Sequence, residues 1–180
     1  NFSQQIEVEI VNYKAKKQSK LERNYFFYFK PYFKIWSLRV RLANIIKLIR
    51  FLRARKRIKY SPKLEITDTF KTISYDLIIF GSDEIWNIKN PLFPNELLFF
   101  GANLNAKHRI SYAPSFGVSK IPNNKINKIA KKLDRFKSIS VRESNGADIV
   151  KALIEKNAEV VLDPTFLMSQ SEWDEIVPNI

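Results

Sequence analysis

The chain lacks several residue types that define whole classes of protein. Its 180 residues contain no Cys, a single His and only four Gly. The absence of Cys excludes disulfides, thiol nucleophiles and cysteine-ligated zinc, and a single His excludes a multi-histidine metal site within this chain. So few Gly exclude a collagen-like repeat, and a hydrophobic content of 45% excludes a disordered chain.

Long apolar runs are missing as well. No segment approaches the roughly 18 consecutive apolar residues that a membrane-spanning helix requires. The length suits one domain that can bury a sizeable core. Because the first residue is Asn1 rather than Met, we expect the chain to be part of a longer protein.

Positive charge is abundant but confined to one segment. The net charge is +13, from 31 Lys and Arg against 18 Asp and Glu. Residues 14–63 hold a net +16, whereas residues 1–13 and 64–180 carry −2 and −1. We therefore expect an early strand in residues 1–13, a basic, aromatic-rich helical insert over 14–63, and the main part of an α/β domain over 64–180.

Residues 35–57 of this insert are predicted to form a basic amphipathic helix. Basic side chains fall mostly between apolar side chains that recur at steps of three and four residues. The apolar residues are Leu38, Leu42, Ile45, Ile46, Ile49 and Leu52. The helix could pack on its own domain with a solvated basic face, lie on an anionic membrane, or bind nucleic-acid phosphates. No nucleic-acid motif accompanies the charge, so we expect no nucleic-acid partner.

From residue 75 onward, short apolar runs alternate with helical patterns. Helices are predicted over about 122–135 and 144–156, and strands over 7–11, 75–80, 109–113, 139–142 and 158–162. Such alternation is typical of βαβ units, so the predicted fold class is α/β, a Rossmann-like parallel sheet with helices on both faces. Open sheets of this kind bind ligands beyond the carboxyl ends of their strands.

Two small-residue turns follow the first two of these later strands. Gly81-Ser82-Asp83 and Ser115-Phe116-Gly117 can offer backbone N–H groups to an anion or hydroxyls to a sugar, or they can be plain strand-to-helix caps. A nucleophilic Ser115 would need a base. His108, the only histidine, is expected at the opposite end of the strand, which disfavours a Ser–His pair.

Arg142 is predicted to stand at the ligand end of the strand over residues 139–142. A guanidinium there can hold a carboxylate or phosphate through two parallel hydrogen bonds. The alternatives are an ion pair with the neighbouring Glu143 or a solvated edge. Further along the chain, Asp163 is expected to cap a turn, and Ser171 is expected to be the N-cap of the last helix.

Four segments, taken in order, resemble the polysaccharide pyruvyl transferase family. They are YDLIIFGSDEIWN (75–87), RISYAPSFG (109–117), ISVRE (139–143) and EVVLDPTFLM (159–168). The resemblance implies a two-domain fold similar to GT-B glycosyltransferases, of which this chain is most of the N-terminal half. The general acid is then expected in a C-terminal domain absent from this chain, so this portion alone is expected to be inactive.

The resemblance also implies an activity and a site. A pyruvyl group passes from phosphoenolpyruvate to a sugar or lipid-linked saccharide of a bacterial surface polysaccharide and forms a ketal, with no cofactor and no metal. Arg142 would contact the anionic donor, and the cleft floor would consist of Gly81, Ser82, Asp83, Ser115 and Gly117. Glu84 stands where the family usually has Gln, which places an added negative charge near the anion.

The implied location is the cytoplasm, with peripheral contact to the inner membrane face through residues 35–57. Two other hypotheses stay open. One is a GT-B-type glycosyltransferase that uses a nucleotide sugar, because a shared fold does not settle the chemistry. The other is a basic module that docks on a membrane or partner without catalysis.

Overall fold

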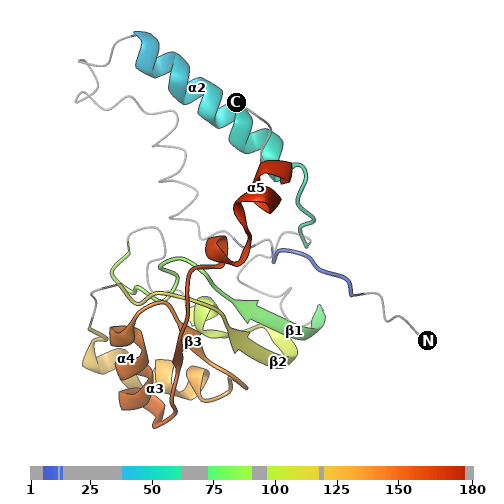
Figure 1. Cartoon of the computed structure of the whole chain (residues 1–180). Coiled ribbons are helices and arrows are strands. Elements are labelled where there is room, and N and C mark those ends of the chain that lie inside the picture. Colours follow the sequence, from blue (N-terminus) through green and yellow to red (C-terminus); the bar gives the residue numbers. More distant parts are fainter. Residues whose placement is uncertain are drawn as a thin grey trace. The chain divides into compact units, whose positions relative to one another are not determined.

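The computed structural model describes residues 6–11, 13, 38–61, 73–90, 97–117 and 120–176 (Figure 1). The chain divides into two compact units, Asn1–Thr69 and Phe70–Ile180. Each unit is described separately below, and the candidate site lies within the second.

The first unit contains the long helix α2, Leu38–Arg55, which confirms most of the helix predicted over residues 35–57; residues 14–37 of the predicted insert lie outside the described residues. Its last turn is basic, and the Arg55 guanidinium lies over the rings of Phe51 and Tyr60, 5.8 and 5.5 Å from their centroids. Tested over the described residues, no helix is both long enough and apolar enough to cross a bilayer.

The prediction of a strand over residues 7–11 is wrong, because this segment forms no continuous strand. Only Ile10 pairs there, as an isolated parallel bridge to Tyr60. The Ile10 N–H donates to the Lys59 carbonyl at 2.8 Å, and the Ser61 N–H donates back to the Ile10 carbonyl at 2.9 Å. A single bridge leaves the flanking apolar residues exposed, Ile6 and Val8 among them.

The second unit is built on short parallel strands, as predicted. Strand β1, Ser74–Phe80, pairs in parallel with β2, Asn105–Ser111, and β3, Ser140–Val141, pairs in parallel with β4, Glu159–Val160. The two pairs meet at an isolated parallel bridge between Ile110 and Ser138. These strands with the intervening helices confirm the α/β class, while helices on both faces and a GT-B-like second domain stay predictions.

Strand β2 differs from its predicted bounds of 109–113. It begins four positions earlier, at Asn105, and ends at Ser111. His108 therefore lies within the strand, opposite Leu77 of β1, rather than before it. The exposed Lys107–Asp76 ion pair, 2.6 Å long, joins the two strands along this polar stretch.

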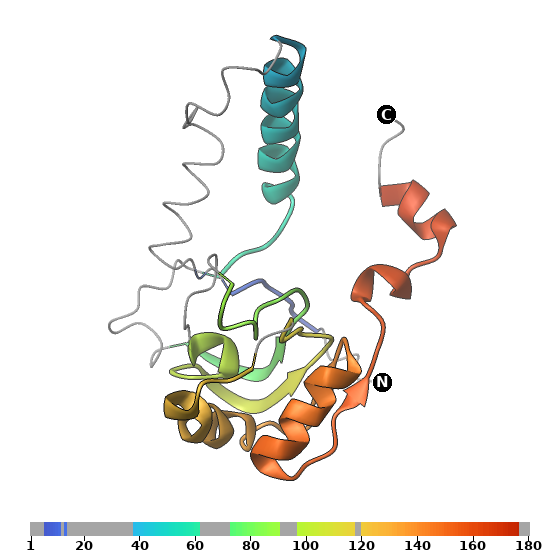
Figure 2. The same cartoon turned by 90° about the vertical axis from the view of Figure 1, so that its left-hand side faces the viewer.

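Helices α3, Asn123–Leu133, and α4, Ser144–Ile154, confirm the two predicted helices and pack against each other (Figure 2). Two short 3-10 turns, η3 (Leu97–Phe100) and η4 (Pro164–Leu167), and the short helix α5 (Gln170–Ile176) complete the described elements.

The N-cap predicted at Ser171 is wrong by two residues, because Ser171 lies inside α5. Ser169 occupies the capping position instead. Its hydroxyl lies 3.4 Å from the backbone nitrogen of Glu172, and the Glu172 carboxylate accepts the Ser169 N–H at 2.7 Å. This reciprocal pair is a capping box.

The core of the second unit is an aromatic cluster around Trp86, whose side chain is fully buried. Its ring stacks on Phe100 with centroids 5.5 Å apart and meets Phe116 at 5.1 Å and Phe136 at 5.9 Å. The indole N–H donates to the Phe99 carbonyl at 2.8 Å, so the only polar group of the ring is satisfied. This cluster supports the loops that follow β1 and β2.

Candidate functional site

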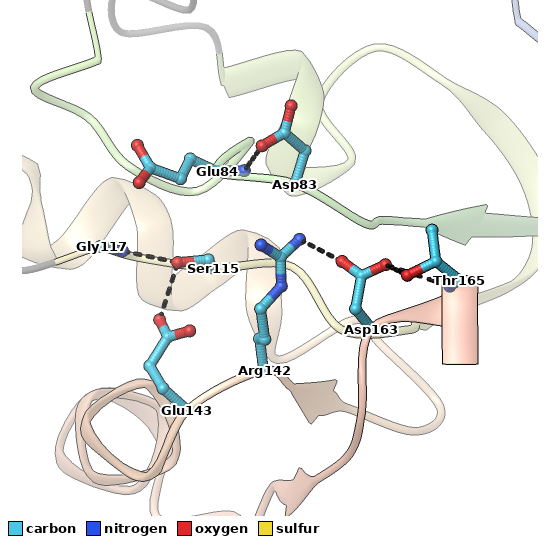
Figure 3. A network of polar contacts seen from close by, with 8 residues as sticks. All are labelled: Asp83, Glu84, Ser115, Gly117, Arg142, Glu143, Asp163 and Thr165. Atoms are coloured by element: carbon cyan, nitrogen blue, oxygen red, sulfur yellow. Dashed lines mark hydrogen bonds and ion pairs between the residues drawn. The ribbon is translucent and has the colours of Figure 1, made fainter. Parts of the chain in front are cut away.

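The loops that follow the four strands converge at the carboxyl ends of those strands (Figure 3). The Ser115 N–H donates to the Asp83 carbonyl at 2.9 Å, which ties the loop after β2 to the loop after β1. The Arg142 N–H donates to the Pro114 carbonyl at 3.3 Å, which ties the loop after β3 to the same place. The structure thus brings the predicted residues together, and their binding of a ligand stays a prediction.

The loop after β1 owes its path to Gly81. Its φ is +148°, and a Cβ there would lie 1.8 Å from the Tyr112 carbonyl oxygen, so only glycine fits. Of the two interpretations left open for this turn, the plain strand-to-helix cap is wrong, because residues 81–90 form turns. Asp83 instead accepts the N–H of Glu84 at 2.7 Å, and Ser82 is half-buried beside it.

Glu84 is engaged with two amides of its own loop. Its Oε2 accepts from the side-chain nitrogens of Asn87 at 2.9 Å and Asn90 at 3.3 Å. A glutamine oxygen could accept the same two bonds, so the family's usual residue is compatible with this loop. What Glu84 adds is a negative charge on the loop that faces Ser115 (Figure 3).

Ser115 is 5% exposed and is held by the carboxylate of Glu143. Its hydroxyl donates to Glu143 Oε1 at 3.0 Å, and the Phe116 N–H donates to the same oxygen at 2.9 Å. The Ser115 oxygen in turn accepts the Gly117 N–H at 2.9 Å. Because His108 is exposed in the middle of β2, Ser115 is a residue of the loop framework rather than half of a Ser–His pair.

Arg142 does not pair with its neighbour Glu143, so that interpretation was wrong. Its Nη2 lies 2.9 Å from Asp163 Oδ2, with side-chain exposures of 32% and 24%. The other Asp163 oxygen accepts from the Thr165 N–H at 3.1 Å and the Thr165 hydroxyl at 2.9 Å. Arg142 Nε is buried, and among the described residues it has no hydrogen-bond partner. Of the five N–H donors of this guanidinium, the one on Nε is shielded by burial, and Nη2 is engaged with Asp163, so Nη1 is the nitrogen without a partner among the described residues that a ligand can use.

Sequence reasoning placed Glu143 and Asp163 on the loops at the ligand end of the sheet, but it did not predict their partners in the site. It considered Glu143 as an ion-pair partner of Arg142, and Asp163 as a turn cap. Asp163 does cap the η4 turn through Thr165, and it also orients the Arg142 guanidinium. The one available signal was that both follow short apolar strands of the same sheet. Among the described residues, no group of three or more His, Asp and Glu could hold a metal ion.

The Asp163 carboxyl group should stay ionised at lower pH than an ordinary aspartate. The backbone and side-chain hydrogen bonds from Thr165 are the main causes that lower its pKa; burial opposes them more weakly, and the charge of Arg142 adds the smallest lowering effect. Because the folded pKa lies below the unfolded one, this stabilisation is complete above the ordinary aspartate pKa of about 3.9. It is lost as the pH falls through the folded-state pKa.

Thr165→Val removes the hydroxyl donor and should raise the pKa of Asp163 part of the way to its ordinary value, so that acid breaks the Arg142–Asp163 pair at a higher pH. NMR titration of the Asp163 carboxyl carbon measures this. Thr165→Ser is the matched control, since it keeps the hydroxyl and should keep the low pKa. An unchanged pKa in the valine variant would contradict the assignment.

Comparison with known proteins decides the family. The family model described as polysaccharide pyruvyl transferase matches residues 2–179. This chain belongs to the polysaccharide pyruvyl transferase family. No curated protein and no solved structure matches it.

Membership in the polysaccharide pyruvyl transferase family covers the whole α/β unit and therefore the loops described above. The family is one of transferases, with a sugar or polysaccharide acceptor implied by its name. The resemblance drawn from four sequence segments is confirmed at this level.

Proposed function

We propose that this protein takes part in the transfer of a pyruvyl group from phosphoenolpyruvate to a sugar of a bacterial surface polysaccharide, with formation of a ketal. The observation that carries the proposal is Arg142. It stands where a parallel sheet presents ligands, it is oriented by Asp163, and Asp163 accepts only one of its donor groups.

The chemistry of the reaction explains why such a cation is needed. Phosphoenolpyruvate carries a carboxylate and a phosphate on the same central carbon. Its methylene carbon takes up a proton, two sugar hydroxyl oxygens bond to the central carbon, and inorganic phosphate leaves. Of the two hydroxyl protons, one balances the new methyl group and the other departs with the phosphate. A fixed guanidinium stabilises the donor anion and the charge on the leaving phosphate.

Thermal-shift measurements on the full-length protein test the donor. Phosphoenolpyruvate at about ten times its dissociation constant should stabilise the protein by roughly 1.4 kcal/mol, a rise of several degrees in Tm. UDP-glucose and inorganic phosphate at the same concentration are the comparisons. A shift with UDP-glucose and none with phosphoenolpyruvate would overturn the proposal in favour of glycosyl transfer.

The first unit supports a second part of the proposal, peripheral contact with an anionic membrane near which lipid-linked saccharides are made. Ile45, Ile49 and Leu52 lie on one face of α2 and are all about half exposed. The described stretch 38–61 contains nine Lys and Arg and no acid. Apolar side chains for the acyl boundary and bases for lipid phosphates are both present, and that combination favours a lipid surface over nucleic acid.

Sedimentation with vesicles tests this contact. The protein should bind vesicles of phosphatidylcholine with 30 mol% phosphatidylglycerol and leave pure phosphatidylcholine vesicles largely free, because each surface base contributes about 1 kcal/mol on anionic lipid. Two triple variants separate the two contributions: Ile45→Ser, Ile49→Ser, Leu52→Ser, and Lys47→Gln, Arg50→Gln, Arg53→Gln. Each should weaken binding at least about tenfold. Binding that survives both sets would contradict the contact.

A further inference from the structure

We propose that the hollow lined by Glu143 binds the acceptor sugar and that Glu143 is the group that accepts hydrogen bonds from its hydroxyls. The inference rests on the proposed function and assigns one part of the same site. The hollow is open to solvent, has a volume of about 410 Å³, and is lined by Ser115, Gly117, Glu143 and Asn145. All four belong to the second unit.

The two oxygens of Glu143 are used differently. Oε1 is occupied, because it accepts both the Ser115 hydroxyl and the Phe116 N–H. Oε2 accepts no hydrogen bond within the part of the chain that the structure describes. A carboxylate oxygen accepts up to two hydrogen bonds and donates none. Oε2 can therefore take a donor from outside the described residues, and a sugar hydroxyl is such a donor.

Asn145 complements this carboxylate from the first turn of α4. Its side-chain nitrogen donates to the Gly117 carbonyl at 3.2 Å, which leaves the amide oxygen as an acceptor on the exposed rim. A carboxylate and an amide together can receive two hydroxyls of one sugar ring. The bonds that hold Glu143 and Asn145 in place come from the same loop, residues 115–117, so the pair is positioned as one set.

Charge decides which substrate the hollow accepts. The negative charge of Glu143 repels the carboxylate and phosphate of phosphoenolpyruvate, and Glu84 on the facing loop adds a second negative side chain (Figure 3). A neutral polyol meets no such penalty. Arg142 precedes Glu143 directly in the chain, yet its guanidinium turns toward Asp163 while Glu143 turns toward Ser115 (Figure 3). Arg142 and Glu143 thus engage different partners, which assigns the donor to the Asp163 side and the acceptor to the Ser115 side of the loop cluster.

Saturation-transfer NMR on the full-length protein tests the proposal. It measures the binding of methyl glycosides of galactose, glucose and N-acetylmannosamine in the absence of phosphoenolpyruvate. At least one glycoside should bind the wild-type protein. Glu143→Gln keeps the oxygen that receives Ser115 and Phe116 and removes the charge, so its dissociation constant for that glycoside should rise at least about fivefold. Asn145→Ala, which touches only an exposed hydrogen bond, should have a similar effect.

A second readout separates binding from mere support of the loop. The thermal shift caused by phosphoenolpyruvate should be kept or increased in Glu143→Gln, because a repelling charge is gone. A variant with a damaged loop would instead lose the binding of both ligands.

Glu155→Gln, the same change at the far end of α4, is the matched control and should bind the glycoside as the wild type does. Unaltered glycoside binding in Glu143→Gln, or none by the wild type, would overturn the inference. Because the sugar experiment contains no phosphoenolpyruvate, a failure of the donor assignment can be distinguished from a failure of the acceptor assignment.

Discussion

Arg142→Ala is expected to lower kcat/KM for phosphoenolpyruvate by about a hundredfold or more in the full-length protein. In the proposed function, Arg142 makes two charge-assisted hydrogen bonds to the donor anion, each contributing roughly 1.5 to 3 kcal/mol, and every 1.36 kcal/mol is a factor of ten in rate. Arg142→Lys keeps a charge without the two-pronged geometry and should recover only part of the loss. Steady-state release of phosphate at varied phosphoenolpyruvate measures both variants.

Stability measurements separate this role from structural support. The Arg142–Asp163 pair is about one-third exposed on the arginine side, so solvent screens it and its loss should change the free energy of unfolding only slightly. Asp163→Asn leaves the guanidinium in place and should reduce turnover less than Arg142→Ala does. Lys151→Ala, which removes an exposed cation from α4, should leave turnover unchanged. Full activity in Arg142→Ala would remove Arg142 from the site.

Trp86→Ala is expected to destabilise the α/β unit by about 3 to 5 kcal/mol, the range for deletion of a large buried aromatic side chain. Trp86 is 0% exposed and is surrounded by Phe100, Phe116 and Phe136, so its removal leaves a cavity that these rings cannot fill without shifting. The backbone N–H of Trp86 also donates to the Ser115 carbonyl at 3.2 Å. Loss of the ring should therefore disturb the loop that carries Ser115.

Urea unfolding followed by circular dichroism measures the effect, and the chain offers a matched control. Trp173 lies on α5, which has no buried residues, and its indole N–H donates to the Thr165 carbonyl at 3.0 Å. Trp173→Ala should cost about 1 kcal/mol, the contribution of one exposed hydrogen bond with modest packing. Equal losses in the two variants would show that Trp86 is not the centre of the core.

The elements that formed as predicted are those whose signal is local. Helices α2, α3 and α4 follow from apolar residues at steps of three and four, and β1 follows from one short apolar run ended by a glycine turn. The prediction missed the first residues of strand β2 because most of them are polar. They pair with β1 through backbone hydrogen bonds, which do not depend on apolar side chains.

The site was predicted as a set of converging loops, but not in its pairings. Arg142 and Glu143 form no ion pair with each other, because the guanidinium lies against Asp163 and the carboxylate accepts from Ser115. Residues adjacent in the sequence consequently face different partners. Their actual partners, Asp163 and Ser115, are brought to them by parallel pairing of β3 with β4 and by the loop after β2.

By itself, the sequence determined what chemistry is excluded and which segments carry the site. The lack of Cys, the single His and the confinement of charge to residues 14–63 depend on composition and order alone. Only the tertiary structure decided that Arg142 is oriented by Asp163 and that Glu143 keeps one oxygen unoccupied beside an open hollow. The physical reason is that these pairings join residues far apart in the chain, where local periodicity carries no information about which side chains meet.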